Sequence, residues 1–139
     1  MPTVAAEREL LAPRDDVWRF VSEPYHLSDW WPGISGVEPD RRGFAEGARW
    51  SVQAGSRPGL LRGSAKPGLL LVEAIEPGTR FAFFLTGERV RADLHLRSPA
   101  LDRTTARLEV DSPWLVGLGR SFPRRALDRL HDLCQTGAA

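Results

Sequence analysis

The segment Val90-Arg91-Ala92-Asp93-Leu94-His95-Leu96-Arg97 has an apolar side chain at every second position. Successive side chains of a β-strand point to opposite faces of a sheet, so this pattern predicts a strand with one dry face and one solvated face. Residues 104–111 repeat the pattern, because Ala106, Leu108 and Val110 alternate with polar residues. Together the two strands predict an antiparallel sheet that covers a core with one of its faces.

Further strands are expected outside this pair, where the same alternation or a short apolar run lies between turn residues. They cover residues 3–11, 34–38, 48–53, 69–76 and 81–85. Between two of them, residues 55–68 are rich in glycine and proline and are expected to form a long hairpin loop.

Two short helices are expected after the first strand. Pro13 suits the first position of a helix, and Asp15 and Asp16 suit the positive end of its dipole. Pro24 ends this helix and opens a second one, which continues to about Trp30.

A last helical segment is expected to begin at Ser112-Pro113 and to be kinked or broken by Gly117, Gly119 and Pro123. Beyond the break, apolar residues recur at helical spacing on one face and charged residues occupy the other. The apolar face consists of Phe122, Ala126, Leu127, Leu130, Leu133 and Cys134.

These elements predict an α+β fold with a curved antiparallel sheet of about seven strands. The dry face of such a sheet needs a cover, and the long C-terminal helix is the element available to provide it. A length of 139 residues fits one domain over residues 1–139.

The composition argues against several classes of protein. Net charge is +1, with 19 basic and 18 acidic residues interspersed, so no nucleic-acid partner is expected. No apolar run approaches the roughly 20 residues of a membrane-spanning helix, and the N-terminal sequence lacks the features of a signal peptide. We therefore expect a cytoplasmic protein without stable membrane insertion, either a monomer or a homodimer.

Neither a metal nor another cofactor is expected. His26, His95 and His131 are not at ligand spacing from one another, and His95 lies on the solvated side of its strand. Cys134 is the only cysteine, which excludes a disulfide within the chain. The glycine patterns of phosphate and dinucleotide sites and the Gly-x-Ser-x-Gly nucleophile turn are absent.

Nearly the whole chain resembles the START-like, or SRPBCC, polyketide cyclase/dehydrase group. The resemblance includes the Pro77…Arg80-Phe81 step, the strand that contains Thr105 and the leucine-rich last helix. Its N-terminal part is the series Ala12-Pro13, Val17-Trp18, Pro24, Trp31-Pro32-Gly33, Val37-Glu38 and Gly47.

The resemblance implies a helix-grip fold, in which the sheet wraps the C-terminal helix and leaves a cavity between them. Members of the group bind lipids, hormones, polyketides and other hydrophobic molecules, and some are enzymes. The cavity wall expected from the dry strand positions and the helix stripe is Trp31, Trp50, Val52, Phe83, Leu94, Leu96, Leu108, Val110, Phe122, Ala126 and Leu130.

Few polar residues are available for chemistry in such a cavity. Arg8 shares strand parity with apolar residues, so its guanidinium is expected to point inward, where it needs an acidic partner or an anionic ligand group. A bulge, or a side chain that reaches solvent at the sheet edge, is the alternative. Tyr25, His26 and Asp29 could exchange protons with a ligand. Alternatively, His26 and Asp29 are exposed and Tyr25 packs.

Three functions are compatible with the sequence. The first is binding or carrying of a small hydrophobic molecule, which an apolar wall favours. The second is a cyclase, aromatase or dehydratase that uses Arg8, Tyr25, His26 or Asp29. The third is a protein-interaction module with a filled core and an exposed apolar patch. Its patch would include Leu60-Leu61 and the consecutive Trp30 and Trp31, which are not both expected to be fully buried.

Overall fold

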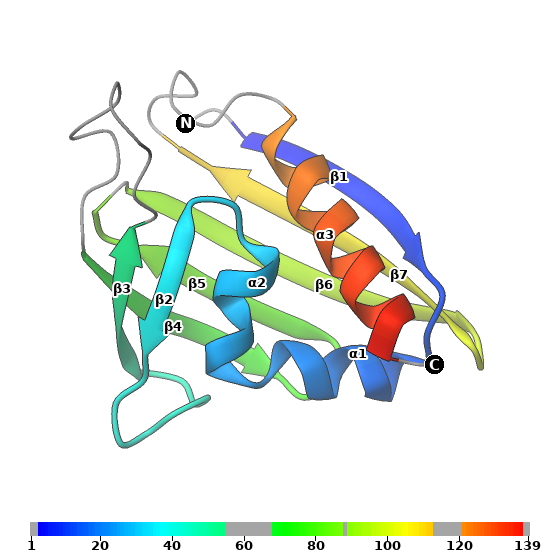
Figure 1. Ribbon diagram of the computed structural model, residues 1–139, viewed down its shortest axis with the longest axis horizontal. Coiled ribbons are helices and arrows are strands. Elements are labelled where there is room, and N and C mark those ends of the chain that lie inside the picture. Colours follow the sequence, from blue (N-terminus) through cyan, green and yellow to red (C-terminus); the bar gives the residue numbers. More distant parts are fainter. Residues whose placement is uncertain (1–2, 55–67, 88, 113–120, 138–139) are drawn as a thin grey trace.

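The structure is a computed structural model that describes residues 3–54, 68–87, 89–112 and 121–137. Within these residues, seven antiparallel strands form a sheet in the order β1-β7-β6-β5-β4-β3-β2 (Figure 1). The strands are β1 (Thr3–Leu10), β2 (Ile34–Glu38), β3 (Arg49–Ala54), β4 (Gly68–Glu76), β5 (Arg80–Leu85), β6 (Val90–Ala100) and β7 (Arg103–Asp111). The predicted strands are thereby confirmed, and β6 continues three residues beyond its expected end.

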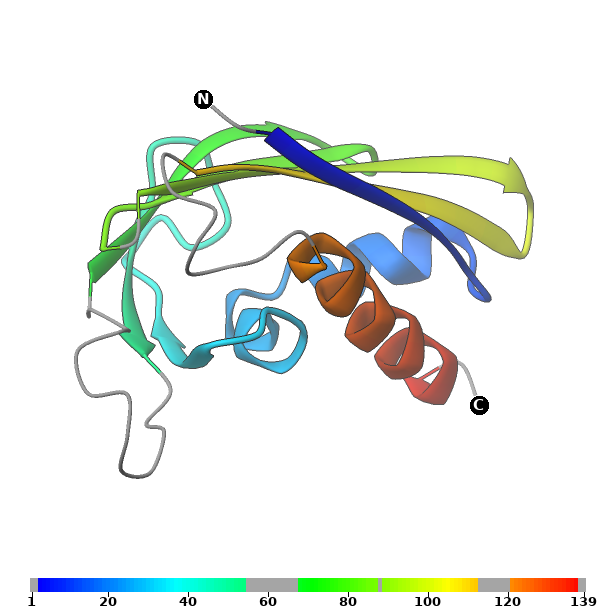
Figure 2. The ribbon, with the colours of Figure 1, turned by 90° about the horizontal axis from the view of Figure 1, so that it is seen from above.

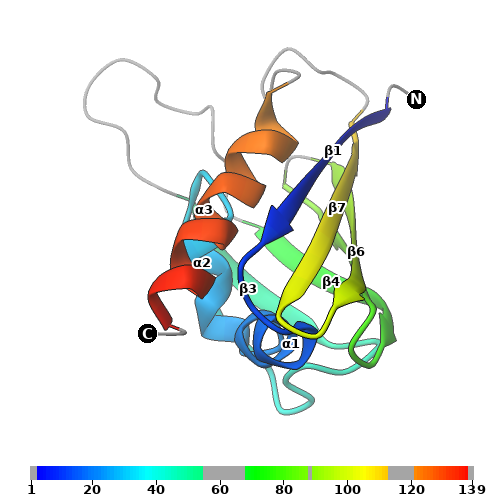
Figure 3. The same cartoon turned by 90° about the vertical axis from the view of Figure 1, so that its right-hand side faces the viewer.

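The sheet curves, and all the described helices lie on its concave side (Figure 2). Register shifts between Ile34 and Gly36, between Val72 and Ala74, and between Arg97 and Ala100 interrupt the ladders, and such bulges bend and twist strands. The longest helix, α3, runs beside β1 and β7 (Figure 3). The helices are α1 (Arg14–Val21), the 3-10 turn η1 (Pro24–His26), α2 (Leu27–Trp30) and α3 (Phe122–Gly137).

Two prolines lie differently from their predicted positions. Pro13 is the residue that precedes α1, with extended backbone angles, and is not its first helical residue. Pro123 lies in the first turn of α3, where a missing N–H breaks no helical hydrogen bond, so it does not interrupt α3. The predicted kink or break before Phe122 falls largely on residues outside the described ranges. Most of the predicted 55–68 loop, together with Pro113, Gly117 and Gly119, lies outside the described residues.

Register places the apolar side chains of the central strands in layers. Leu108 of β7 is paired with Leu94 of β6 on one side and with Ala6 of β1 on the other. Val110, the next inward residue of β7, has Ala92 and Val4 as its partners. Because the side-chain period of a strand is two, this register turns the apolar residues of these layers towards α3.

The convex face carries a lattice of charged side chains. Arg80 holds Asp93 through two hydrogen bonds of 2.8 and 2.9 Å, and His95 lies 3.0 Å from the same carboxylate. Arg91 is paired with Glu73 at 2.8 Å across the sheet. The expected solvated position of His95 is confirmed, since 43% of its side chain is exposed. The two faces of the sheet therefore differ sharply in polarity.

Trp30 and Trp31 are both buried, which corrects the expectation that consecutive tryptophans could not be. Trp30 is 0% and Trp31 is 1% exposed. The backbone turns between them, because α2 ends at Trp30 and Trp31 has an extended conformation. Their rings meet edge to face, with centroids 5.8 Å apart. The two side chains can thus enter the core in different directions.

The connection between β2 and β3 folds back against the core. Asp40 holds it by accepting backbone N–H groups from Arg42, Gly43 and Arg49, with the Arg49 bond at 2.9 Å. Phe44, within the connection, packs its ring 4.7 Å from that of Phe81 on β5. Phe44 lies outside any periodic segment, so no sequence pattern predicted its place in the core.

The layer that contains Leu108 is expected to make a large contribution to stability. Leu108→Ala should lower the free energy of unfolding by about 2–5 kcal/mol, since it leaves a cavity in a fully buried layer. Leu101, which is 94% exposed, provides the matched control. Leu101→Ala should change the same quantity by less than about 0.5 kcal/mol. Urea denaturation of both variants measures the difference, and equal effects would contradict the assigned register.

Candidate functional site

The predicted wall residues gather on the concave face of the sheet and the facing side of α3. All of them are buried, apart from the half-buried Val52. They come from β3, β5, β6 and β7, from the end of α2 and from α3. Inward alternation on the strands and the apolar stripe of the helix therefore converge on one apolar region, which we call the interior region.

Three aromatic rings join the layers of the interior region. The ring of Trp31 lies 5.2 Å from that of Phe83 on β5 and 4.9 Å from that of Phe122 on α3, measured between centroids. Both contacts are edge to face, which is the favoured geometry for such pairs. Trp31 thereby connects the sheet to the first turn of α3.

Arg8 lies on the inward side of β1, as its parity predicted, and has an acidic partner. Its Nη1 donates a hydrogen bond of 2.5 Å to Oδ1 of Asp128 on α3. The two side chains are 40% and 44% exposed, so the pair lies at the margin of the interior region. Arg8 thus has the acidic partner that its inward position called for, and the rest of its guanidinium can reach solvent.

Tyr25, His26 and Asp29 do not form a converging group. Tyr25 is 60% exposed and Asp29 is exposed, so the expected packing of Tyr25 is wrong. His26 is half-buried, and its Nδ1 lies 2.8 Å from the carbonyl oxygen of Phe20. No hydrogen bond or ion pair joins these three side chains to one another or to Arg8 among the contacts of the described residues.

Polar groups within the core are mostly paired. The hydroxyl of Thr104 donates to the carbonyl of Ala12 at 2.8 Å, and the Trp50 indole donates to the carbonyl of Gly43 at 2.7 Å. Nε1 of Trp30 is buried and has no hydrogen-bond partner among the residues that the structure describes. Leaving such a donor unpaired costs about 1–3 kcal/mol, so an acceptor brought to it would be stabilising.

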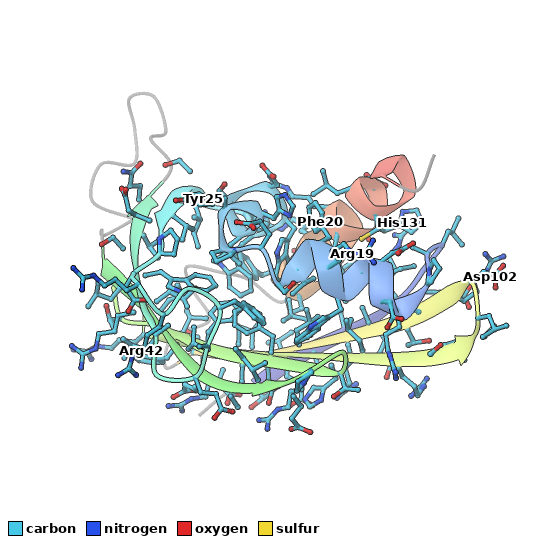
Figure 4. The ribbon with its side chains drawn as sticks, turned by 90° about the horizontal axis from the view of Figure 1, so that it is seen from below. Arg19, Phe20, Tyr25, Arg42, Asp102 and His131 are labelled. Atoms are coloured by element: carbon cyan, nitrogen blue, oxygen red, sulfur yellow. The ribbon has the colours of Figure 1, made fainter. Side chains whose placement is uncertain are left out.

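A separate cavity of about 300 Å³ opens between α1, η1 and the C-terminal part of α3. We call it the α1–α3 pocket. Figure 4 shows Arg19 and Phe20 on α1, with His131 on the neighbouring α3. Sequence analysis identified no pocket there, because residues distant in sequence form it only once the helices pack. Its lining residues are Ala12, Asp16, Arg19, Phe20, His26, Leu133 and Cys134.

Two further cavities follow the seam between the edge strand β1 and α3. One, of about 360 Å³, is lined by residues that include Ala6 and Arg124, and another, of about 260 Å³, includes Arg8 and Asp128. Charged side chains of both signs line them, so neither resembles the apolar pocket that the sequence predicted.

The structure gives no sign of a metal centre or a membrane-spanning helix within the residues that it describes. No three histidine, cysteine, aspartate or glutamate side chains are grouped as metal ligands there. None of the described helices combines the length and the apolar character needed to cross a bilayer.

The fold and its apolar interior can be compared with known proteins. Residues 1–132 match the family model described as polyketide cyclase / dehydrase and lipid transport. The chain belongs to this family. No curated protein is significantly similar to it in sequence.

Solved structures share the family fold at low sequence identity. TTHA0849 from Thermus thermophilus is 19% identical, with a TM-score of 0.73 over 99% of this chain and 100% of that one. The di-domain ARO/CYC BexL, from the BE-7585A biosynthetic pathway, is 18% identical with a TM-score of 0.72. DynU16, from the dynemicin biosynthetic locus, is 21% identical with a TM-score of 0.68.

The comparisons with these two biosynthetic proteins cover only part of them. The match spans 95% of this chain but 46% of BexL, and 97% of this chain but 48% of DynU16. This chain therefore corresponds to about half of either protein. The likeness to these solved structures is one of fold, and that fold is the helix-grip fold that the sequence resemblance implied.

Cys134 should behave as a poor nucleophile. Burial, with a contribution from the negative charge of Asp16, raises the pKa of its thiol to about 11. Because the thiolate is the reactive form, alkylation by iodoacetamide at pH 8 should be about 100-fold slower in the folded than in the urea-unfolded protein. The folded rate should still rise between pH 8 and 9.5. A folded rate that levels off near pH 8.5 would contradict the buried position of the thiol.

Proposed function

We propose that this protein binds a small hydrophobic molecule, of lipid, polyketide or aromatic type, in the interior region between the sheet and α3. The observation that carries the proposal is the apolar wall that β3, β5, β6 and β7 present to the apolar stripe of α3. Ligand sites are lined predominantly by hydrophobic and aromatic side chains, with few polar groups. The family description, which includes lipid transport, supports the same class of ligand.

The aromatic side chains favour a ligand with a flat ring system. Trp31, Phe83 and Phe122 form a continuous set of ring contacts, with Trp50 on the neighbouring part of the sheet. Ring faces and edges offer large apolar contact area together with a preferred geometry. An aromatic polyketide or a comparable planar molecule fits this chemistry better than a single flexible chain.

A cyclase or dehydratase is the second candidate, because BexL is described as an ARO/CYC protein. Such chemistry needs a proton donor or acceptor within hydrogen-bond reach of the substrate. Arg8 is paired with Asp128, while Tyr25 and Asp29 are exposed to solvent. The contacts of these candidates therefore give binding more support than catalysis.

The hypothesis of a protein-interaction module with a filled core is less well supported, because part of its expected apolar patch is buried. Trp30 and Trp31 are buried and cannot supply an exposed apolar patch. Leu60-Leu61, the rest of the suggested patch, lies outside the described residues. A binding protein and a module of this kind therefore differ in whether the interior region holds a ligand or is filled by side chains.

Ala126→Leu tests whether the interior region holds a ligand or is filled by side chains, because Ala126 is 0% exposed on the inner face of α3. If the interior region holds a ligand, the added methyl groups should occupy part of its space, with thermal stability unchanged and ligand retention lost. In a filled core, the same change should destabilise the protein by about 1–3 kcal/mol. Ala100→Leu, at an exposed position of β6, is the matched control.

Ligand retention is measured by native mass spectrometry of protein purified from its natural source. We expect a mass increment of a small organic molecule, present in the wild type and in Ala100→Leu and absent from Ala126→Leu. The released molecule is then assayed for conversion in the same extract, because conversion indicates an enzyme and no conversion indicates a carrier. Wild-type protein without any adduct, combined with a destabilised Ala126→Leu variant, would refute the binding proposal.

A further inference from the structure

We propose that the α1–α3 pocket is a second binding site, which takes a small aromatic molecule that carries a hydrogen-bond donor, such as a phenol or an arylalkylamine. The pocket shares no lining residue with the interior region. Its volume of about 300 Å³ exceeds the roughly 150 Å³ that is enough for benzene, so one ring with short substituents fits.

A stacked pair of rings forms one wall of the α1–α3 pocket. Phe20 and His26 lie nearly parallel, with centroids 4.2 Å apart and planes inclined by 17°. Leu133 and Ala12 add apolar surface from α3 and from the residues just before α1. Flat apolar surface of this kind suits an aromatic body.

The hydrogen bond of His26 fixes what its ring can offer to a ligand. The carbonyl oxygen of Phe20 can only accept, so Nδ1 of His26 carries the proton in the 2.8 Å bond. In the neutral ring Nε2 is then an acceptor, and no described residue is hydrogen-bonded to it. The imidazole therefore presents a lone pair that a ligand O–H or N–H group can approach.

Asp16 adds a second acceptor of greater strength. Its carboxylate lines the pocket together with Cys134, whose thiol pKa is raised first by burial and second by this charge. Arg19, the basic residue of the lining, has an 80% exposed side chain, 3.7 Å from the Asp16 carboxylate. The Asp16 side chain is 49% exposed, so carboxylate and imidazole both offer acceptor atoms to a ligand, while most of the Arg19 side chain faces solvent. Donor-bearing ligands are selected over acceptors and anions.

The test is a titration of ¹⁵N-labelled full-length protein followed by amide chemical shifts. The probes are benzylamine, phenol, toluene and benzoate at matched concentrations. We expect saturable shifts at residues that line the α1–α3 pocket with benzylamine, phenol or both, and at least tenfold weaker effects with toluene and benzoate. Whichever of the first two binds identifies the donor as a cation or a neutral hydroxyl.

Variants assign the effect to the proposed groups. Asp16→Asn should weaken benzylamine binding at least fivefold, whereas Asp15→Asn, one residue away on the exposed side of α1 and outside the lining, should leave it unchanged. His26→Phe keeps a ring beside Phe20 but removes the acceptor, so it should weaken phenol binding. Thermal melting of each variant checks that the fold is retained.

The proposal is overturned if neither donor probe produces saturable shifts at the lining residues. It is also overturned if benzoate binds as tightly as benzylamine, or if Asp15→Asn and Asp16→Asn have equal effects. Should His26→Phe fail to fold, the Asp16→Asn and Asp15→Asn pair still decides the outcome. Shifts confined to the interior region would likewise refute a second site while leaving the proposed function intact.

Discussion

The packing of α3 against the concave face of the sheet is the interaction on which the rest of the structure depends. An antiparallel sheet of this size can keep one face in water, but its inward leucines and valines require a cover. Because α3 lies along β1 and β7, it closes one side of the interior region, and the α1–η1–α2 segment closes another. Trp31 joins the two covers through its contact with Phe122. The interior region lies between α3 and the sheet, and the α1–α3 pocket lies where α1 and η1 meet α3.

The position of polar groups divides the molecule into regions with different chemical capacities. In the interior region, hydrogen-bonding groups are few and are satisfied mainly by the protein, which suits retention of an apolar molecule. The charged network of the convex face, such as the Arg80–Asp93 pair, is partly solvated, and its side chains pair with one another across the strands. Between these extremes, the α1–α3 pocket combines apolar surface with a carboxylate and an imidazole. An amphipathic site of this kind is suited to discriminating between ligands by their polar groups.

Sequence patterns predicted the strands and the inward face of α3 well, because both follow from a fixed side-chain period. The parity of Arg8 was also correct, yet its partner Asp128 lies 120 residues away, and only the register of α3 on β1 brings them together. Local patterns failed where the backbone changes direction, as between Trp30 and Trp31 or in the connection that carries Phe44. The α1–α3 pocket was missed for another reason, because its residues come mainly from α1, η1 and α3 and meet only when these helices pack.

The Asp40 turn makes one end of the core sensitive to acid. Its carboxylate accepts backbone N–H groups, the strongest effect coming from Arg49, and these bonds hold the pKa of Asp40 below its usual value. Since the folded pKa is lowered, the stabilisation is fully present above the unfolded pKa and is lost as the pH falls through the folded one. Protonation would release the connection that presses Phe44 against Phe81. In strong acid, this loop should therefore be held less firmly against the core.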